Sequence, residues 1–119
     1  MAKEVMGGGR LHYITNLPTG VTCSALSWIV KNGICYVSAW NIKSTKAGFN
    51  YDLSTTMPPT KGNYLGIFTD GTANSIAGGD LYIEYQNPRT LVGIFPQANI
   101  GYYTSFSYPV DDNWVEPSN

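Results

Sequence analysis

The chain alternates short apolar runs, rich in β-branched and aromatic residues, with glycine and proline, and it carries almost no helical pattern. No stretch of ten residues repeats apolar positions at the 3.6-residue helical period. Thirteen glycines and seven prolines separate the runs, and turn signals between strand-like runs are typical of a sandwich or barrel. The pattern therefore predicts an all-β fold built from antiparallel strands.

The strongest local signal is a hairpin whose turn is Asn32-Gly33. An Asn-Gly pair adopts positive φ at both central positions of a type I′ turn, and the twist of that turn matches the flanking strands. A two-residue loop between strands at 24–31 and 34–42 pairs Val30 with Cys35 and Ser27 with Ser38. One predicted face then carries Leu26, Trp28, Val30, Cys35, Val37 and Ala39, and the other carries Cys23, Ala25, Ile29, Ile34, Tyr36, Trp40 and Ile42.

Both predicted faces of this hairpin are apolar. In a small antiparallel domain one face normally meets water and alternates to polar residues. A neighbouring subunit that covers the second face is the favoured interpretation. The alternatives are that loops of the same chain cover it or that its aromatic rings stay half exposed.

The remaining strand-like runs fit one domain. We expect a flexible tail over residues 1–10 and a single β-domain over residues 11–119. Its further strands are predicted at 10–15, 63–69, 80–86, 90–95 and 101–109, with Asn87-Pro88 as the turn between 80–86 and 90–95.

Charge is scarce in the sequence. Charged residues make up 13% of the 119 residues and the net charge is −1, so the basic footprint of a nucleic-acid-binding protein is missing. No apolar stretch approaches the roughly 18–20 residues that a membrane-spanning helix needs, and residues 1–10 do not read as a signal peptide. A neutral surface rich in hydroxyl and aromatic groups suits sugars or another subunit.

No residue pattern predicts catalysis, a metal or a cofactor. Cys23 and Cys35 fall on opposite predicted faces of the hairpin, so free thiols and assembly in a reducing cytoplasm are favoured. His12 has no nucleophile or acid partner nearby in the sequence. Asp80 and Glu84 lie about 13 Å apart along one strand with Tyr82 between them, an arrangement that does not suit the carboxyl pair of a glycosidase.

Five segments in order resemble the C-terminal heads of bacteriophage tail-fibre and baseplate receptor-binding proteins. They are "WIVKNGICYVSAW", "TTMPPTKG", "IFTDGT", "GGDLYIEYQNP" and "GYYTSFSYPV". The resemblance covers about residues 20 to 110 and depends on the order of these segments. It implies a β-sandwich of jelly-roll or tumour-necrosis-factor-like form, closed as a homotrimer on a fibre tip.

The resemblance also implies a function. The expected role is non-catalytic attachment to a bacterial cell-wall glycan or surface polysaccharide, from a virion position beside other tail or baseplate proteins. The alternatives are a structural decoration or assembly module without a receptor and, third, a glycan-degrading enzyme.

Two sets of residues are predicted to carry these interactions. The trimer interface is expected to include Ile29, Tyr36, Trp40 and Ile42 on the second face of the hairpin. The glycan is expected at polar loops and their aromatic edges, at Phe49, Tyr51, Asn74, Asn99, Tyr102 and Tyr103.

Overall fold

The structure, a computed structural model, describes residues 9–72 and 74–117. Within these ranges it contains eight strands and no helix, so no helix there is long and apolar enough to cross a membrane. The strands are β1 (His12–Tyr13), β2 (Val21–Lys31), β3 (Ile34–Ser44), β4 (Asn50–Ser54), β5 (Tyr64–Thr69), β6 (Ser75–Glu84), β7 (Asn87–Ile94) and β8 (Tyr102–Pro109). The predicted all-β class is confirmed.

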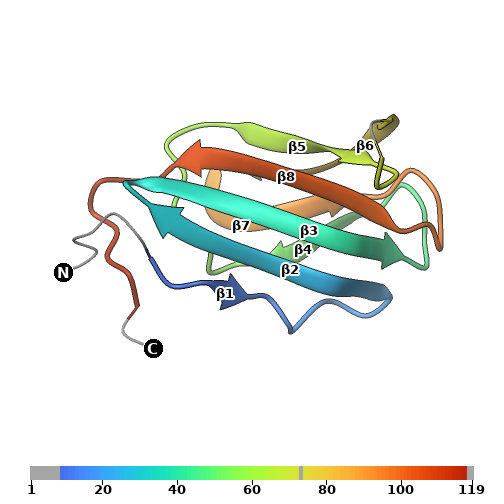
Figure 1. The fold of residues 1–119 in the computed structure, drawn as a ribbon, viewed down its shortest axis with the longest axis horizontal. Helices are drawn as coiled ribbons and strands as arrows, with labels where there is room; N and C mark the ends of the chain where they lie inside the picture. The colour runs from blue at the N-terminus through green and yellow to red at the C-terminus, as the bar shows by residue number, and fades with distance from the viewer. Residues whose placement is uncertain (1–8, 73, 118–119) are drawn as a thin grey trace.

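The strands form one curled antiparallel sheet in the order β1-β2-β3-β8-β5-β6-β7-β4. Strands β1, β2, β3 and β8 make a front layer in Figure 1, and β4, β6 and β7 lie behind it. The sheet turns from one layer to the other where Thr69 on β5 pairs with Tyr103 on β8. This arrangement is that of a β-sandwich and is consistent with a jelly-roll-like fold.

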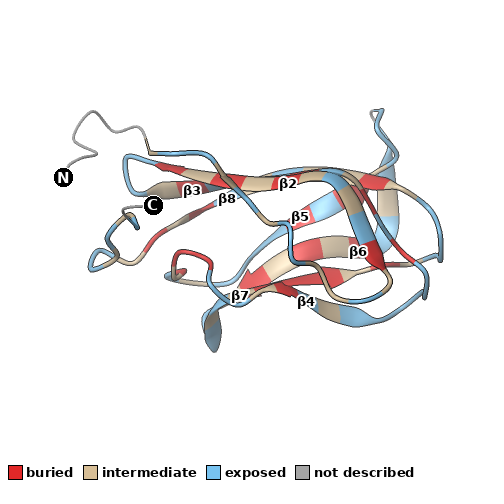
Figure 2. Ribbon diagram, turned by 90° about the horizontal axis from the view of Figure 1, so that it is seen from below, coloured by how far each residue is buried: buried red, intermediate tan, exposed pale blue. Residues whose placement is uncertain are grey.

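The core lies between the two layers, where buried positions face each other in Figure 2. Four large aromatic side chains, Phe68, Phe95, Tyr102 and Tyr108, are almost completely buried. Phe68 stacks on Tyr102 with ring centroids 4.8 Å apart, and it also packs against Phe95 with centroids 5.6 Å apart. Burial of these rings, together with the aliphatic side chains of the same core, stabilises the fold.

The predicted hairpin is confirmed in register, but its two faces are not as predicted. Ser27 pairs with Ser38 and Val30 with Cys35, as a two-residue loop requires. Asn41 adopts a φ of 57°, and the pairing of β3 with β8 is interrupted between Ala39 and Ile42. This irregularity reverses the alternation of side chains, so Ile42 turns inward and is 0% exposed. Ile42 is therefore a core residue, and the prediction that placed it on the outer face was wrong.

Several further boundaries differ from the predictions, and strand β4 at Asn50–Ser54 was not among the predicted strands. The first strand has two residues where 10–15 was expected, and β6 begins at Ser75 rather than residue 80. The turn between β6 and β7 consists of Tyr85 and Gln86, since Glu84 pairs with Asn87. Asn63 explains this shift, because its Oδ1 accepts a 2.7 Å hydrogen bond from the backbone N of Tyr85.

The first and last described segments lie against each other. The His12 ring stacks on Trp28 with centroids 3.9 Å apart, and its Nε2 contacts the carboxylate of Glu116. Arg10 donates to the carbonyl of Pro117 at 3.0 Å. Residues 1–8 of the predicted tail lie outside the described residues. His12 is thus held by aromatic packing and a carboxylate, which is a structural role.

Both thiols are free, as predicted. The two thiols are too far apart to form a disulfide. Cys23 pairs with Ile42, and Ile42 lies seven residues, or about 24 Å, along β3 from Cys35. Cys23 packs against the edge of the core, so the predicted separation by opposite faces is not the reason.

We expect Cys35 to resist alkylation in the folded protein. Burial raises the pKa of its thiol to about 12, and the reactive species is the thiolate. At pH 9, where an ordinary thiol with the usual pKa of 9.0 is half ionised, only about one Cys35 in a thousand would be ionised. Mass spectrometry after iodoacetamide treatment should show Cys35 modified only in denaturant; rapid native modification would contradict its burial.

Candidate functional site

A row of serines crosses the outer face of the front layer. Ser27 on β2 pairs with Ser38 on β3, and Ser38 pairs with Ser105 on β8. On the other side of Ser27, Tyr13 of β1 continues the row. Cross-strand neighbours on one face have Cβ atoms about 5 Å apart, so the three hydroxyls form a continuous polar strip across adjacent strands.

Apolar and aromatic side chains stand on both sides of this strip. Tyr36 on β3 pairs with Ile29 on β2 and with Ser107 on β8, and its side chain is 47% exposed. Trp40, two residues beyond Ser38, is 62% exposed and meets Tyr103 edge to face, with ring centroids 5.0 Å apart. The strip therefore runs between two walls that carry aromatic rings.

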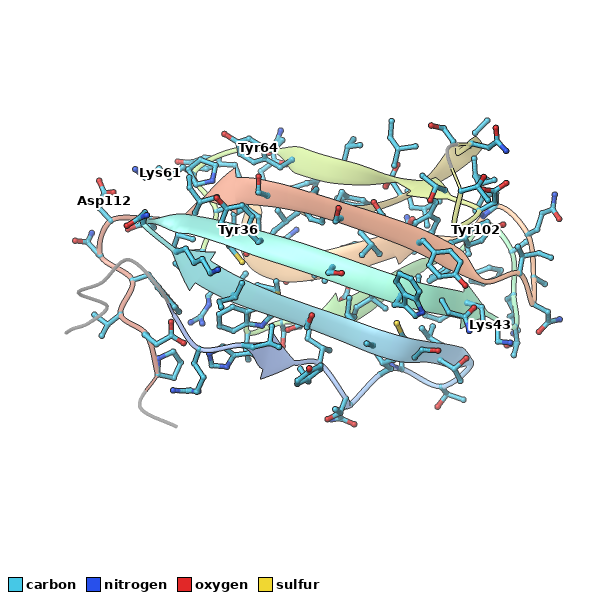
Figure 3. The ribbon with its side chains drawn as sticks, in the orientation of Figure 1. Tyr36, Lys43, Lys61, Tyr64, Tyr102 and Asp112 are labelled. Carbon is cyan, nitrogen blue, oxygen red and sulfur yellow. The ribbon has the colours of Figure 1, made fainter. Side chains whose placement is uncertain are left out.

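On the Tyr36 side of the strip the surface is hollowed, with a volume of about 310 Å³. Its lining contains no charged side chain, and four of the nine residues are serine. The residues are Leu11, Ser27, Ile29, Tyr36, Val37, Ser38, Ser105, Phe106 and Ser107. We call this hollow, together with the strip and the Trp40–Tyr103 pair, the serine groove. In Figure 3, Lys61 and Asp112 are labelled near one end of the molecule and Lys43 near the other, and Tyr36 lies between these two ends.

Three of the four predicted interface residues, Ile29, Tyr36 and Trp40, lie along the serine groove. Tyr36 and Trp40 stay well exposed and Ile29 is half-buried in the single chain. The fourth, Ile42, is in the core as described above.

The predicted aromatic ligand residues have different surroundings. Tyr102 is 1% exposed, so it belongs to the core and cannot reach a ligand. Its hydroxyl accepts a hydrogen bond from the backbone N of Gln97 at 3.2 Å. Tyr51 is half-buried and packs against Phe95 at 6.0 Å. Tyr103 is the exception, because it faces outward beside Trp40 at the end of the serine groove.

The remaining predicted ligand residues lie in loops at the end of the sandwich where β3, β5 and β7 finish. Phe49 is 51% exposed, with the Lys46 ammonium 5.6 Å from its ring centroid. Asn99 is exposed at a φ of 62° and its backbone N donates to the carbonyl of Ser44. Of the predicted ligand residues, the structure brings Phe49 and Tyr51 together, with ring centroids 6.3 Å apart.

Asn74 and Asp70 are hydrogen-bonded to each other within one of these loops. The Asp70 carboxylate accepts 2.9 Å and 2.5 Å hydrogen bonds from the backbone N and hydroxyl of Thr72, and a 3.3 Å bond from the Asn74 amide. The Thr72 hydroxyl and backbone bonds are the main reason that the pKa of Asp70 lies below its usual value. This is the arrangement of an ordinary turn.

The carboxylates of β4 and β6 lie on the outer face of the back layer, away from the serine groove. Asp80 pairs with Ile67 on one side and Ile94 on the other, and burial raises the pKa of its carboxyl. Tyr82 stands between Asp80 and Glu84 on the same face. Among the residues the structure describes, no three His, Cys, Asp or Glu side chains are grouped closely enough to hold a metal ion.

The sequence contained part of the signal for the serine groove. The hairpin register already placed Ser27 opposite Ser38, and Ser105 and Ser107 alternate with Thr104 and Phe106 in the closing strand. The missing information was that β8 lies beside β3 rather than beside β7, which it follows in the chain.

Comparison with known proteins gives no relative. No protein-family model, no curated protein and no solved structure matches this chain. The interpretation of the serine groove therefore depends on its own chemistry.

Proposed function

We propose that the serine groove binds an uncharged glycan and that the chain is a binding domain without catalytic activity. The observation that carries this proposal is the strip of serine hydroxyls on a neutral surface between exposed aromatic rings. A hydroxyl both donates and accepts hydrogen bonds, and so matches the hydroxyls of a sugar. The faces of aromatic rings match the apolar C–H surface of a pyranose ring.

A glycan suits this surface better than another protein does. Serine is depleted in the cores of protein–protein interfaces, where aromatic residues, methionine and arginine are enriched. The serine groove has the aromatic rings, but its floor is polar and no arginine lies in its lining. Glycan binding here therefore departs from the predicted trimer interface, which used Ile29, Tyr36 and Trp40 of the same face: self-association of the chain would have to use another face and leave the groove open to solvent.

The resemblance to phage tail-fibre heads supports a bacterial cell-wall glycan as the natural ligand, and a tail-fibre or baseplate tip as the location. A single groove of this kind is expected to bind weakly, with a Kd of about 1 mM. Several copies on one particle would raise the apparent affinity by multivalency.

Retention on purified bacterial cell walls tests this proposal. We expect the protein, displayed in several copies on a bead, to be retained and to be displaced by soluble cell-wall polysaccharide. Sodium chloride at about 0.5 M should change the retention little, because the lining of the hollow contains no charged side chain. The assay should release no reducing sugar. A lack of retention on walls from every bacterium tried would favour a structural module, and sugar release would favour an enzyme.

A further inference from the structure

The two walls of the serine groove differ in chemistry. At the hollow, the wall consists of Leu11, Ile29 and Tyr36, so two aliphatic side chains lie beside one ring. Leu11 is 46% exposed and Ile29 is half-buried. The opposite wall carries the Trp40 and Tyr103 rings. A ligand that only stacked its sugar rings on aromatic faces would leave the aliphatic corner uncovered.

We infer that the serine groove selects glycans that carry N-acetyl groups, an inference that rests on the proposed function. An acetamido substituent has a methyl group, an N–H donor and a carbonyl acceptor. The methyl group would lie against Leu11 and Ile29 while the sugar ring covers Tyr36. The amide would pair with serine hydroxyls of the adjacent strip, which can serve as acceptor for the N–H and donor for the carbonyl.

The lining also disfavours the charged relatives of this ligand. A free amino sugar is a cation and a uronic acid is an anion, and each would lose hydration without gaining an opposite charge in this hollow. The nine lining residues include no Asp, Glu, Lys, Arg or His. An N-acetylated sugar is neutral, so it can enter the hollow without needing a side chain of opposite charge.

A matched pair of soluble probes tests the inference. The β1,4-linked tetramers of N-acetylglucosamine and of glucose differ only in the substituent at C2. In a calorimetric or NMR titration we expect the acetylated tetramer to bind at least about tenfold more tightly, from one buried methyl group and its amide hydrogen bonds. The de-acetylated tetramer, a cation, should bind more weakly than the acetylated one.

Two variants locate the selectivity in the aliphatic corner. Leu11→Ser and Ile29→Ser should each lower the affinity for the acetylated tetramer several-fold more than they lower the affinity for the glucose tetramer, because both residues line the groove but only the acetylated sugar places a methyl group against them. Ile100→Ser is the matched control, because Ile100 is 44% exposed outside the groove. Leu11→Ser removes an exposed side chain, so it remains informative if Ile29→Ser lowers stability.

The outcomes separate this inference from the proposed function. Equal affinities for the two tetramers, or a preference that both variants retain, would overturn the selectivity and leave glycan binding intact. Binding of neither tetramer would also overturn the selectivity, and retention on cell walls would then decide the proposed function by itself.

Discussion

Replacement of Tyr102 by alanine is expected to lower the free energy of unfolding by about 3–5 kcal/mol. Tyr102 is 1% exposed and stacks on Phe68 at 4.8 Å, between the two layers of the sandwich. Alanine would leave a cavity that the surrounding strands cannot fill. A loss of this size is a large fraction of the 5–15 kcal/mol that domains typically have, and thermal unfolding should show a midpoint lowered by more than about 10 °C.

Two companion variants separate packing from other roles of this side chain. Tyr102→Phe keeps the ring and removes only the hydroxyl that accepts from the Gln97 backbone N, so it should cost about 1 kcal/mol. Tyr103→Ala removes the next side chain, which is half-buried on the outer face and packs edge to face with Trp40, so it should lower stability less than Tyr102→Ala does. If Tyr102→Ala proved as stable as the parent yet bound no glycan, Tyr102 would be a ligand residue and its placement in the core would be wrong.

Changes in the serine groove are expected to act in the opposite way, on binding and not on stability. Tyr36→Ala and Trp40→Ala should each weaken glycan binding at least about tenfold, because each removes a ring that covers a sugar face. Ser38→Leu should abolish measurable binding, since it places an apolar side chain in the middle of the hydroxyl strip. All three side chains are exposed, so unfolding midpoints should stay close to that of the parent.

The control for these three variants is Tyr85→Ala. Tyr85 is 67% exposed in the turn between β6 and β7, outside the groove. Its removal should leave cell-wall retention unchanged. Retention that survived in Tyr36→Ala, Trp40→Ala and Ser38→Leu alike would exclude the serine groove as the binding site.

The parts of the fold that depend on residues adjacent in the sequence, such as the β2–β3 hairpin, could be predicted. Asn32-Gly33 determines its own turn, and that turn determines which residues of β2 and β3 pair. The reversal at Asn41 could not be predicted in the same way, because Ile42 and not glycine follows Asn41, so no local turn signal marks its positive φ of 57°. Asn41 lies where β3 meets the start of β8, and the register of that strand pair shifts between Ala39 and Ile42.

The candidate site was less predictable because it is assembled from strands that are distant in the chain. Ser105 reaches Ser38 only because β8 pairs with β3, across 66 positions of sequence. The choice of ligand residues relied on loops and on exposed tyrosines. Tyr102 and Tyr103 look equivalent in sequence, yet strand alternation buries the first and leaves the second half-buried on the outer face.

The most direct test of the account is a map of backbone amide shifts during titration with the N-acetylglucosamine tetramer. Binding in the serine groove predicts the largest ¹H–¹⁵N shift changes at Ser27, Tyr36, Ser38 and Ser105, with small changes in the loops at the end of the sandwich. The account would be contradicted if the largest changes clustered at Phe49, Asn74 and Asn99 while the amides of the three serines stayed unmoved.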